Sequence, residues 1–524
     1  MSKEIRGITD NLKSMDRDQV VKKPFARFVD ALKRPTNASY FMAWLILACY
    51  GLSATGAVFL LPLIGWLVMK FFFMKQLETA PLMIPIQDQL LDINNPNPAD
   101  NVSPMPGEGI FYLGSRFGDN KEIWITDSDC RQHFLVLGTT GAGKTELLLG
   151  FAANAISWGS GMIFVDGKGD IKTMAALLSL AKRWGREADF LVLNFMSKDG
   201  ELAPGEIISN TMNPYTTAAP DDVINQLGGL TADGGGDGMW KERAMSLIGV
   251  VIQPLCWGRD NGKIELSLAN IRHYIQLRNL ATLLKGDERF DAMPESIKSE
   301  IRIYLSSLGN YDFNKGGEEQ GDDVVKQHGF LEMQWTAPLG SLAKTYGSIF
   351  NTDYGEVDMF DVVLNRRILI VMLPALKKMP DEVERMGKII VASLKSMMGS
   401  TLGNLGGVSD ASILDAVKIR VTTAPYPFLV ILDEVGYYTV NGMAMMAAQA
   451  RSLGFSMIYA AQDLQSMKRN NEKEAASIIA NTNIKVIMRS EDKDTADLAV
   501  AAGGRGSRIR AKGYRRSEKQ PVFG

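Results

Sequence analysis

The sequence predicts an α/β protein built on a parallel sheet, and three observations support this fold class. Short apolar segments recur along the chain, and each ends at a polar residue or a glycine. They are continuously apolar rather than alternating, which is typical of strands covered on both faces. Helical patterns at 144–158 and 171–184 separate the early segments, as parallel strands require. The predicted strands lie at 133–138, 161–166, 189–194, 368–374, 428–433, 455–462 and 484–489.

Composition excludes several classes of protein. The 524 residues are enough for about three domains, and their apolar and charged contents are ordinary for a globular protein. The 57 Lys and Arg against 59 Asp and Glu give a net charge of -2, so contact with nucleic acid would need a local basic patch. Three cysteines and three histidines argue against a disulfide framework and against a metal cluster built by the protein.

A long uncharged run near the N-terminus predicts insertion in a membrane. No Asp, Glu, Lys, Arg or His occurs from Pro35 to Met69. The apolar part, as one helix, would be roughly 45 Å long against a hydrocarbon core of about 30 Å. A hairpin over 40–74, turning near Gly51, fits better than one tilted helix, because the positive-inside rule places both basic flanks in the cytoplasm. A buried core helix is the other alternative. The flanking cations are Lys22, Lys23, Arg27, Lys33, Arg34, Lys70 and Lys75.

The segment HFLVLGTTGAGKTELLLG contains the phosphate-loop pattern GxxxxGK[ST] between a predicted strand and a predicted helix. Its glycines let backbone N–H groups turn inward around phosphates, which a Cβ would obstruct. We expect Lys144 to meet the β- and γ-phosphates and the Thr145 hydroxyl to hold Mg²⁺, with the helix dipole adding to binding. The pattern predicts an ATP and Mg²⁺ site; a glycine-rich turn without ligand is the alternative. The expected nucleotide-binding residues are Gly138, Thr139, Thr140, Gly141, Ala142, Gly143, Lys144, Thr145 and Glu146.

Two acids end the predicted strand 428–433 and suit this loop. Asp433 would bind a water on Mg²⁺, which makes it a metal-site residue beside Thr145, and Glu434 would orient and polarise the attacking water. A strand followed by two acids is common, so the pair gains its meaning from the phosphate loop. Glu434 favours hydrolysis over simple retention of the nucleotide.

Other polar residues at strand ends have two interpretations each. Gln462 would sense the γ-phosphate, or it is only a polar strand terminus. Arg451 would act as an arginine finger across a subunit boundary, or it caps its helix. Asp166 and Lys168, in FVDGKGD, face the same rim of the sheet, where a structural loop and a catalytic role are both compatible with the sequence.

The chain divides into segments of different character. The stretch 220–345 lacks apolar strands and shows helical periods, which indicates an all-helical domain inserted into the sheet domain. The predicted segments are a cytoplasmic tail (1–39), a transmembrane hairpin (40–74), the first part of the nucleotide-binding domain (75–219), the all-α domain (220–345), the second part of the nucleotide-binding domain (346–505) and a basic C-terminal segment (506–524).

These motifs together resemble the type IV secretion coupling proteins, the membrane-anchored ATPases of conjugation and effector export. The likeness covers most of 36–505 and is greatest to type IVB, Dot/Icm-like and IncI-plasmid-like members. It rests on the hairpin, GTTGAGKTE, FVDGKGD, TMNPY (211–215) before a helix with Trp240, ILDEVG and ARSLGFSMIYAAQ.

The resemblance implies a RecA-like nucleotide domain, a helical domain facing the substrate, and a homo-hexamer around a channel. It also implies a bacterial inner-membrane location with the ATPase facing the cytoplasm, and partners among the secretion inner-membrane components and adaptor proteins. Lys144, Thr145, Asp433, Glu434, Arg451 and Gln462 match the family's nucleotide positions. Many type IVB relatives carry a long C-terminal extension for adaptors, so either such an extension is missing after Gly524 or substrates are recruited otherwise.

The substrate is left open by the sequence. The segment 505–519 has seven basic residues and one acid around Tyr514, which suits contact with nucleic-acid phosphates but also a solvated tail. A relaxase–DNA complex and protein effectors both fit the resemblance. The alternatives to a secretion ATPase are a chromosome-segregation DNA translocase, which DGKGD and TMNPY fit less well, and a non-hydrolysing membrane scaffold. An ABC transporter subunit is disfavoured because no LSGGQ signature occurs.

Overall fold

The computed structural model of the chain describes residues 50–51, 91–96, 104–106, 110–115, 122–196, 209–230, 238–373, 379–402, 426–439, 442–469 and 471–503. Two compact units can be distinguished. One comprises 1–107, 114–123 and 500–524, and the other comprises 108–113 and 124–499. The second unit contains both the main sheet and the large helical region, so the residues that matter below lie within it.

A seven-stranded sheet forms the centre of the second unit, with strand order β11-β5-β10-β9-β6-β8-β7. Every neighbouring pair is parallel, so the carboxyl ends of all the strands meet at one edge. All seven predicted strand segments are confirmed, and so is the α/β class. The strands are β5 (Phe134–Leu137), β6 (Met162–Asp166), β7 (Phe190–Asn194), β8 (Ile368–Met372), β9 (Phe428–Leu432), β10 (Phe455–Ala461) and β11 (Ile484–Ile487).

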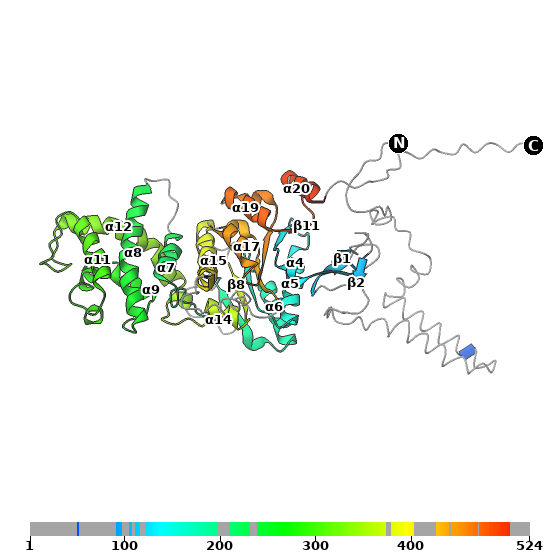
Figure 1. Cartoon of the computed structure of the whole chain (residues 1–524), viewed down its shortest axis with the longest axis horizontal. Coiled ribbons are helices and arrows are strands. Elements are labelled where there is room, and N and C mark those ends of the chain that lie inside the picture. The colour runs from blue at the N-terminus through cyan, green and yellow to red at the C-terminus, as the bar shows by residue number, and fades with distance from the viewer. Residues whose placement is uncertain are drawn as a thin grey trace, which may run out of the picture. The chain divides into compact units, whose positions relative to one another are not determined.

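Alternate residues of the strands enter two separate cores, which explains why the strand sequences are apolar throughout. On one face, Phe134 and Phe164 pack with Leu148 and Phe151 of α5 (Lys144–Ser157) and with Leu177 of α6 (Ile171–Arg183). The opposite face contacts a second set of helices (Figure 1). These are α14 (Met359–Leu364), α15 (Pro380–Leu402), α17 (Met443–Ala450), α18 (Leu464–Lys468) and α19 (Glu472–Asn481).

Between β7 and β8 the described chain is helical from α7 onward. Helix α8 packs against α7, α9, α11 and α12 (Figure 1). The buried indole of Trp335 on α12 donates to the Ala244 carbonyl of α8 at 3.0 Å, which fixes the two long helices together. The helices are α7 (Pro220–Gly228), α8 (Gly238–Asp260), α9 (Leu268–Tyr274), α10 (Leu277–Thr282), α11 (Glu295–Ser307), α12 (Asp322–Gly340) and α13 (Gly347–Phe350), with short turns η5 (Glu288–Phe290) and η6 (Ser341–Thr345).

Smaller elements complete the described chain. Strands β1 (Leu91–Pro96) and β2 (Pro104–Pro106) form an antiparallel pair, and β3 (Phe111–Ser115) lies beside β4 (Glu122–Ile125). The remaining elements are α4 (Asp127–Cys130), η4 (Glu187–Asp189), η7 (Val435–Tyr437) and α20 (Lys493–Gly503).

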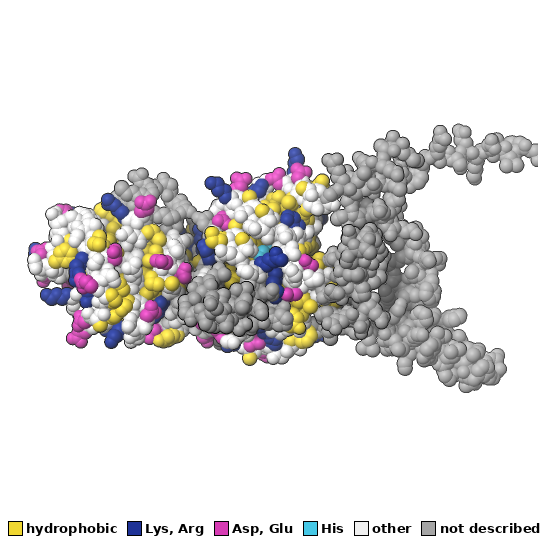
Figure 2. Space-filling model, in the orientation of Figure 1, with side chains coloured by type: hydrophobic (Ala, Val, Ile, Leu, Met, Phe, Trp, Pro, Cys, Tyr) yellow, Lys and Arg dark blue, Asp and Glu magenta, His cyan; other side chains and the backbone are white. Residues whose placement is uncertain are grey.

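The surface charge and the apolar helices of the described part can be compared with the predicted charge balance and the predicted membrane hairpin. Figure 2 shows acidic and basic side chains interspersed over the visible face, as the small net charge leads one to expect. None of the helices in the described ranges is both long and apolar enough to cross a bilayer. The predicted hairpin 40–74, apart from 50–51, and the basic segment 506–524 lie outside the described residues.

Candidate nucleotide-binding site

The phosphate loop connects the carboxyl end of β5 to the start of α5. Gly141 and Gly143 have φ angles of 80° and 93°, a left-handed conformation that residues with a Cβ adopt at a cost. The Ala142 N–H donates to the Thr139 carbonyl at 3.0 Å and closes the loop. Helix α5 begins at Lys144, so the N–H groups of its first turn have no acceptor within the helix and are oriented to bind phosphate oxygens.

The base of the loop is hydrogen-bonded to β10 on one side and to the chain that follows β11 on the other. The Gly138 N–H donates to the Ala461 carbonyl of β10 at 3.2 Å. On the other side, the backbone N–H of Thr139 and its hydroxyl both donate to the Arg489 carbonyl, each at 3.0 Å. The Thr139 hydroxyl therefore has a structural partner. Arg489 could not be predicted from the sequence, because a hydrogen bond to a backbone carbonyl does not depend on residue type.

The two acids lie after β9, which β10 separates from the phosphate-loop strand. Glu434 has φ 53° and ψ 43°, a left-handed conformation that costs of order 1 kcal/mol for a residue with a side chain. Asp433 supports it, because its Oδ1 accepts the Glu434 N–H at 3.0 Å. The Tyr438 hydroxyl donates to the Asp433 carbonyl at 2.7 Å. The turn thus directs the Glu434 side chain toward the phosphate loop.

Lys144 joins the loop to the acids. Its Nζ lies 2.8 Å from Glu434 Oε1 and 3.3 Å from Asp433 Oδ1, and all three side chains are buried. Gln462, at the carboxyl end of the intervening strand β10, donates from Nε2 to the same Glu434 oxygen at 3.3 Å. The structure therefore brings together four of the predicted site residues around one carboxylate.

Lys168 also contacts that carboxylate, with Nζ 2.9 Å from Glu434 Oε1. It belongs to the turn between β6 and α6, and β6 is the neighbour of β9 in the sheet. Asp166 shapes the turn by accepting the N–H groups of Lys168 and Asp170 at 2.9 and 2.7 Å. Asp170 in turn caps α6 by accepting the Lys172 N–H at 2.9 Å.

Burial and charge act against each other in this cluster. The ammonium groups of Lys144 and Lys168 outweigh the desolvation of Glu434 and lower its pKa. Desolvation dominates at Asp433 and raises its pKa, although Lys144 opposes this. Burial also raises the pKa of Asp166 to about 6. Two cations thus face three carboxylates, and Glu434 is the acid kept most firmly ionised.

The other predicted residues are placed differently. Thr145 is half-buried in the first turn of α5, while Thr140 and Glu146 are exposed. Within the described part of the chain, none of these three side chains forms a hydrogen bond or ion pair that would assign it a role. Arg451 is exposed at the C-terminal end of α17, before β10 begins. It therefore lies at the amino end of the strand, whereas the phosphate loop lies at the carboxyl end of the parallel strand β5. A strand as long as β10 separates these edges by about 20 Å, so Arg451 is not a residue of its own chain's cluster.

His133 fixes the end of the helix that precedes Arg451. Its Nε2 donates to the Ala447 carbonyl at 2.6 Å, and its Nδ1 accepts the Met457 N–H at 3.1 Å. Burial lowers the pKa of His133 to about 4, and the nearby Arg451 charge adds to this effect. The imidazole is thus neutral and holds α17 against β10.

A small pocket opens beside the acid cluster. It has about 50 Å³ of space and is lined by Glu434, Gly436, Tyr437, Gln462, Ser466 and Arg469. The Arg469 guanidinium lies 5.9 Å from the centre of the Tyr437 ring, within the range of a cation–π contact. Sequence reasoning missed Arg469, which follows α18; its position shortly after the end of β10 was the only available signal.

The TMNPY segment forms a joint rather than part of this cluster. Asn213 donates from Nδ2 to the carbonyls of Leu266 and Asp353 at 2.9 and 2.8 Å, and its Oδ1 accepts the Tyr215 N–H at 3.1 Å. The Met212 N–H donates to the Ile349 carbonyl at 2.9 Å. These bonds connect the entry and exit of the helical region, which accounts for the asparagine in the motif.

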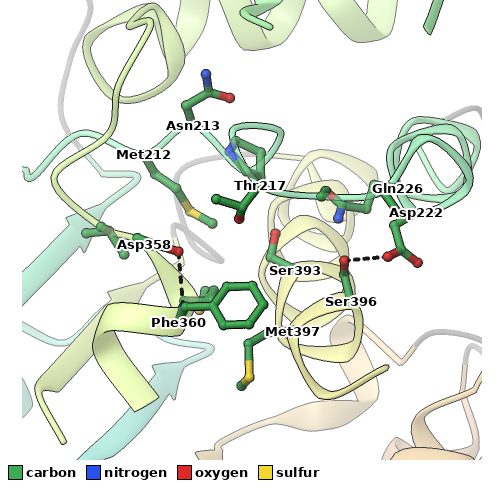
Figure 3. Close-up of a pocket in the computed structure, with 15 residues that line it drawn as sticks. Met212, Asn213, Thr217, Asp222, Gln226, Asp358, Phe360, Ser393, Ser396 and Met397 are labelled. Atoms are coloured by element: carbon green, nitrogen blue, oxygen red, sulfur yellow. Dashed lines mark hydrogen bonds between the residues drawn. The ribbon is translucent and has the colours of Figure 1, made fainter. Parts of the chain in front are cut away.

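A second polar pocket lies beside this joint. Figure 3 shows Asp222 and Gln226 of α7 near Ser393 and Ser396 of α15, with the Ser396 hydroxyl donating to Asp222 at 2.9 Å. Gln226 is 5% exposed, and neither of its amide atoms has a partner in the described part of the chain. The pocket has about 40 Å³ of space, enough for a few waters that would hydrate this amide.

Two sequence comparisons bear on the family. A family model described as the TraM recognition site of TraD and TraG matches residues 427–520. The type 4 coupling protein DotL of Legionella pneumophila is 39% identical over 494 residues, which cover 91% of this chain and 62% of that protein. The resemblance to type IV secretion coupling proteins is confirmed. The chain spans less than two thirds of the length of this coupling protein.

Solved structures give weaker similarity. Plasmid coupling protein TrwB with the GTP analogue GDPNP has a TM-score of 0.46 and 14% identity, covering 75% of this chain and 79% of that one. TrwB with ADP and Mg²⁺ has a TM-score of 0.45 and 14% identity, covering 73% and 76%. VirB4 of Thermoanaerobacter pseudethanolicus has a TM-score of 0.41 and 10% identity, covering 76% and 88%. At these values the ligands of those structures are not assigned to this chain.

Proposed function

We propose that this chain is a membrane-anchored ATPase that couples substrate recruitment to export by a type IV secretion system. The observation that carries the proposal is the convergence of Lys144, Asp433, Glu434 and Gln462 at the end of a phosphate loop. A non-hydrolysing scaffold would not require a buried carboxylate beside the phosphate-binding lysine. The 39% identity to a type 4 coupling protein supports the secretion role.

In this proposal the nucleotide is ATP, held by the loop from Gly138 to Glu146 and by the first turn of α5. The Thr145 hydroxyl and the Asp433 carboxylate are of the oxygen type that Mg²⁺ prefers. Thr145 follows Lys144 directly in the sequence, and Asp433 Oδ1 lies 3.3 Å from the Lys144 ammonium. Mg²⁺, when bound there, would neutralise charge on the β- and γ-phosphates.

The protein's own groups supply the rest of the mechanism. Lys144 turns from Glu434 to the phosphates and stabilises charge there. Glu434, which Lys168 and Gln462 still hold, orients the attacking water and accepts its proton. Gln462 contacts Glu434 from the intervening strand, so a change at the γ-phosphate would reach the carboxylate through it. Arg451 would act on a neighbouring subunit, since it lies away from its own phosphate loop.

The assembly and location follow from the family and are part of the proposal. We infer a homo-hexamer anchored in the bacterial inner membrane by the hairpin 40–74, with its RecA-like and all-α domains in the cytoplasm. Its partners would be inner-membrane secretion components, adaptor proteins, and either a relaxase–DNA complex or effectors. The match of 427–520 to a model described as the TraM recognition site of TraD and TraG supports a partner surface within this segment, which also contains Glu434.

The test is steady-state ATPase activity of the full-length chain in detergent or nanodiscs, with and without single-stranded DNA. We expect Mg²⁺-dependent hydrolysis that Glu434→Gln abolishes. Tight binding of ATP without turnover would instead support a scaffold. Co-purification from the native host would separate the substrates, because a relaxase indicates conjugation and an adaptor with bound effector indicates protein export.

A further inference from the structure

The Glu434 carboxylate has more donors on one oxygen than that oxygen can bind well. Lys144, Lys168 and Gln462 approach Oε1 at 2.8, 2.9 and 3.3 Å. One carboxylate oxygen offers about two lone-pair sites, so the two ammonium groups take the short contacts and the amide takes the longer one. Lys144 and Lys168 therefore share a single acceptor, although they come from different elements of the chain.

The turn that carries Lys168 packs closely against Asp433 and Glu434. A Cβ on Gly167 would lie 2.8 Å from both the Asp433 carbonyl and Glu434 Cβ, closer than real contacts allow. Gly169 has a φ of 62°, and a Cβ there would lie 2.6 Å from the Leu373 carbonyl. Only glycine fits these two positions. Lys168 lies between them, and its backbone N–H donates to the Asp166 carboxylate. The sequence DGKGD thus positions one side chain, that of Lys168.

The two lysines differ in what else they can do. Lys144 is 5% exposed and begins the helix behind the phosphate loop, whereas Lys168 is 40% exposed at the rim. Binding of a nucleotide at the proposed site requires Lys144 to leave Glu434 for the phosphates. Glu434 is 3% exposed, and a buried carboxylate that loses its last cation is strongly destabilising. Without a second cation, Glu434 would therefore retain Lys144.

We propose that Lys168 is a positioning residue that takes over the Glu434 carboxylate and so frees Lys144 to bind nucleotide phosphates. This inference rests on the proposed function for the identity of the ligand, but it does not depend on hydrolysis. When Lys144 leaves, Lys168 keeps its short contact with Glu434 Oε1, and the Gln462 amide can move closer to the same oxygen. Lys168 need not touch the nucleotide.

The experiment measures binding of the Mg²⁺ complex of a non-hydrolysable ATP analogue to the full-length chain by calorimetry. Lys168→Met should weaken binding at least about 10-fold, because Lys144 is then the only ammonium group at Glu434 and is retained there. Glu434→Gln in the same chain should restore affinity to within about 3-fold of the wild type, since a neutral amide no longer competes for Lys144. Lys168→Arg should keep wild-type affinity. Lys172→Met is the matched control, since Lys172 is an exposed lysine of the same helix start and should have no effect.

The outcomes separate the inference from the proposed function. If Lys168→Met weakens binding and Glu434→Gln does not restore it, Lys168 contacts the phosphates directly or only shapes the turn, and the exchange is wrong. If Lys168→Met binds normally, Lys144 needs no help and the inference is again wrong. Normal binding and rescue without any turnover would overturn the ATPase role alone. A wild-type chain that binds no nucleotide would overturn both.

Discussion

Lys144 Nζ lies 2.8 Å from Glu434 Oε1, so the lysine predicted to bind phosphate forms an ion pair with the predicted catalytic acid. Both side chains are almost fully buried. The pair connects the phosphate loop to the turn after β9. A substitution at either residue therefore has two separable effects, one on stability and one on the proposed reaction.

Lys144→Ala should abolish nucleotide binding, because it removes the main side-chain charge on the β- and γ-phosphates. It should also destabilise the free chain, by less than the roughly 3–5 kcal/mol of an uncompensated buried charge, because Asp433 loses its cation while Lys168 still contacts Glu434. Thermal unfolding and nucleotide titration measure the two effects. Adding Glu434→Gln should recover part of the stability but none of the binding. Wild-type affinity in Lys144→Ala would refute the site.

Glu434→Gln should bind ATP and retain it. The amide keeps the shape of the side chain but cannot accept a proton from the attacking water. We expect turnover to fall by about 10²-fold or more while the KM or binding constant changes little. Rapid-quench measurement of bound ATP checks this. Normal turnover would remove Glu434 from the mechanism.

Arg451→Ala should bind ATP normally but turn over at least about 10³-fold more slowly, the scale that arginine fingers supply. Arg451 is exposed at the amino edge of β10, away from its own phosphate loop, so an arginine finger at this position would act on a neighbouring subunit. Activity per subunit should therefore rise with protein concentration. In a mixture with Lys144→Ala, an Arg451→Ala subunit keeps its phosphate loop and borrows an arginine. Activity should partly return; mixed assemblies that stay inactive would make Arg451 a structural residue.

His133 should make stability fall in mild acid. Its pKa of about 4 in the folded chain lies below the ordinary value of 6.5, so the unfolded chain takes up a proton first as the pH falls. The contribution is complete above pH 6.5 and is lost progressively from there to about pH 4, up to about 3 kcal/mol. His133→Asn suits the φ of 67° and should flatten this part of the profile. Parallel pH profiles of the two chains would contradict the assignment.

The hairpin predicts that both flanks of 40–74 face the cytoplasm. Cysteines introduced as Lys22→Cys and Lys75→Cys, in a chain with Cys49→Ser, should resist an impermeant maleimide added from the periplasmic side. Both should react after the cells are opened. Labelling of either one in intact spheroplasts would indicate a single pass.

The positions of the strands could be predicted from the sequence, because burial on both faces makes each strand a continuous apolar segment. Strand order was not predictable, since seven similar parallel strands permit many orders. That order decides the site: β6 lies beside β9, and this neighbourhood alone places Lys168 on Glu434. The sequence left Asp166 and Lys168 between a structural and a catalytic interpretation. Asp166 shapes the local turn, whereas Glu434, the partner of Lys168, is more than 260 residues away in the sequence.

The residues around the nucleotide site were predicted to different extents. Lys144, Asp433, Glu434 and Gln462 meet as expected, because motifs at strand ends share one edge of a parallel sheet. The Thr139 side chain was predicted for the nucleotide, but its hydroxyl bonds to a backbone carbonyl of the chain after β11. Such a bond depends on tertiary placement and not on residue type, so the sequence did not indicate it. The joint built by Asn213 is a similar case.

The carbonyl of Arg489 has a mechanical consequence. Strand β11 is the last in the sheet, and the chain leaves it directly through this carbonyl, which both donors of Thr139 bind. The Met488 N–H also donates to the Leu137 carbonyl at 2.8 Å. The next attachment along the chain is Thr495 of α20, whose buried hydroxyl accepts the Leu464 N–H of α18 at 3.0 Å. A force applied beyond α20 therefore acts on α18 before it reaches the base of the phosphate loop. The segment after β11 thus connects the phosphate loop, through the Arg489 carbonyl, with α18, through Thr495 and through Asp494, which accepts from Gln465 Nε2 at 2.7 Å.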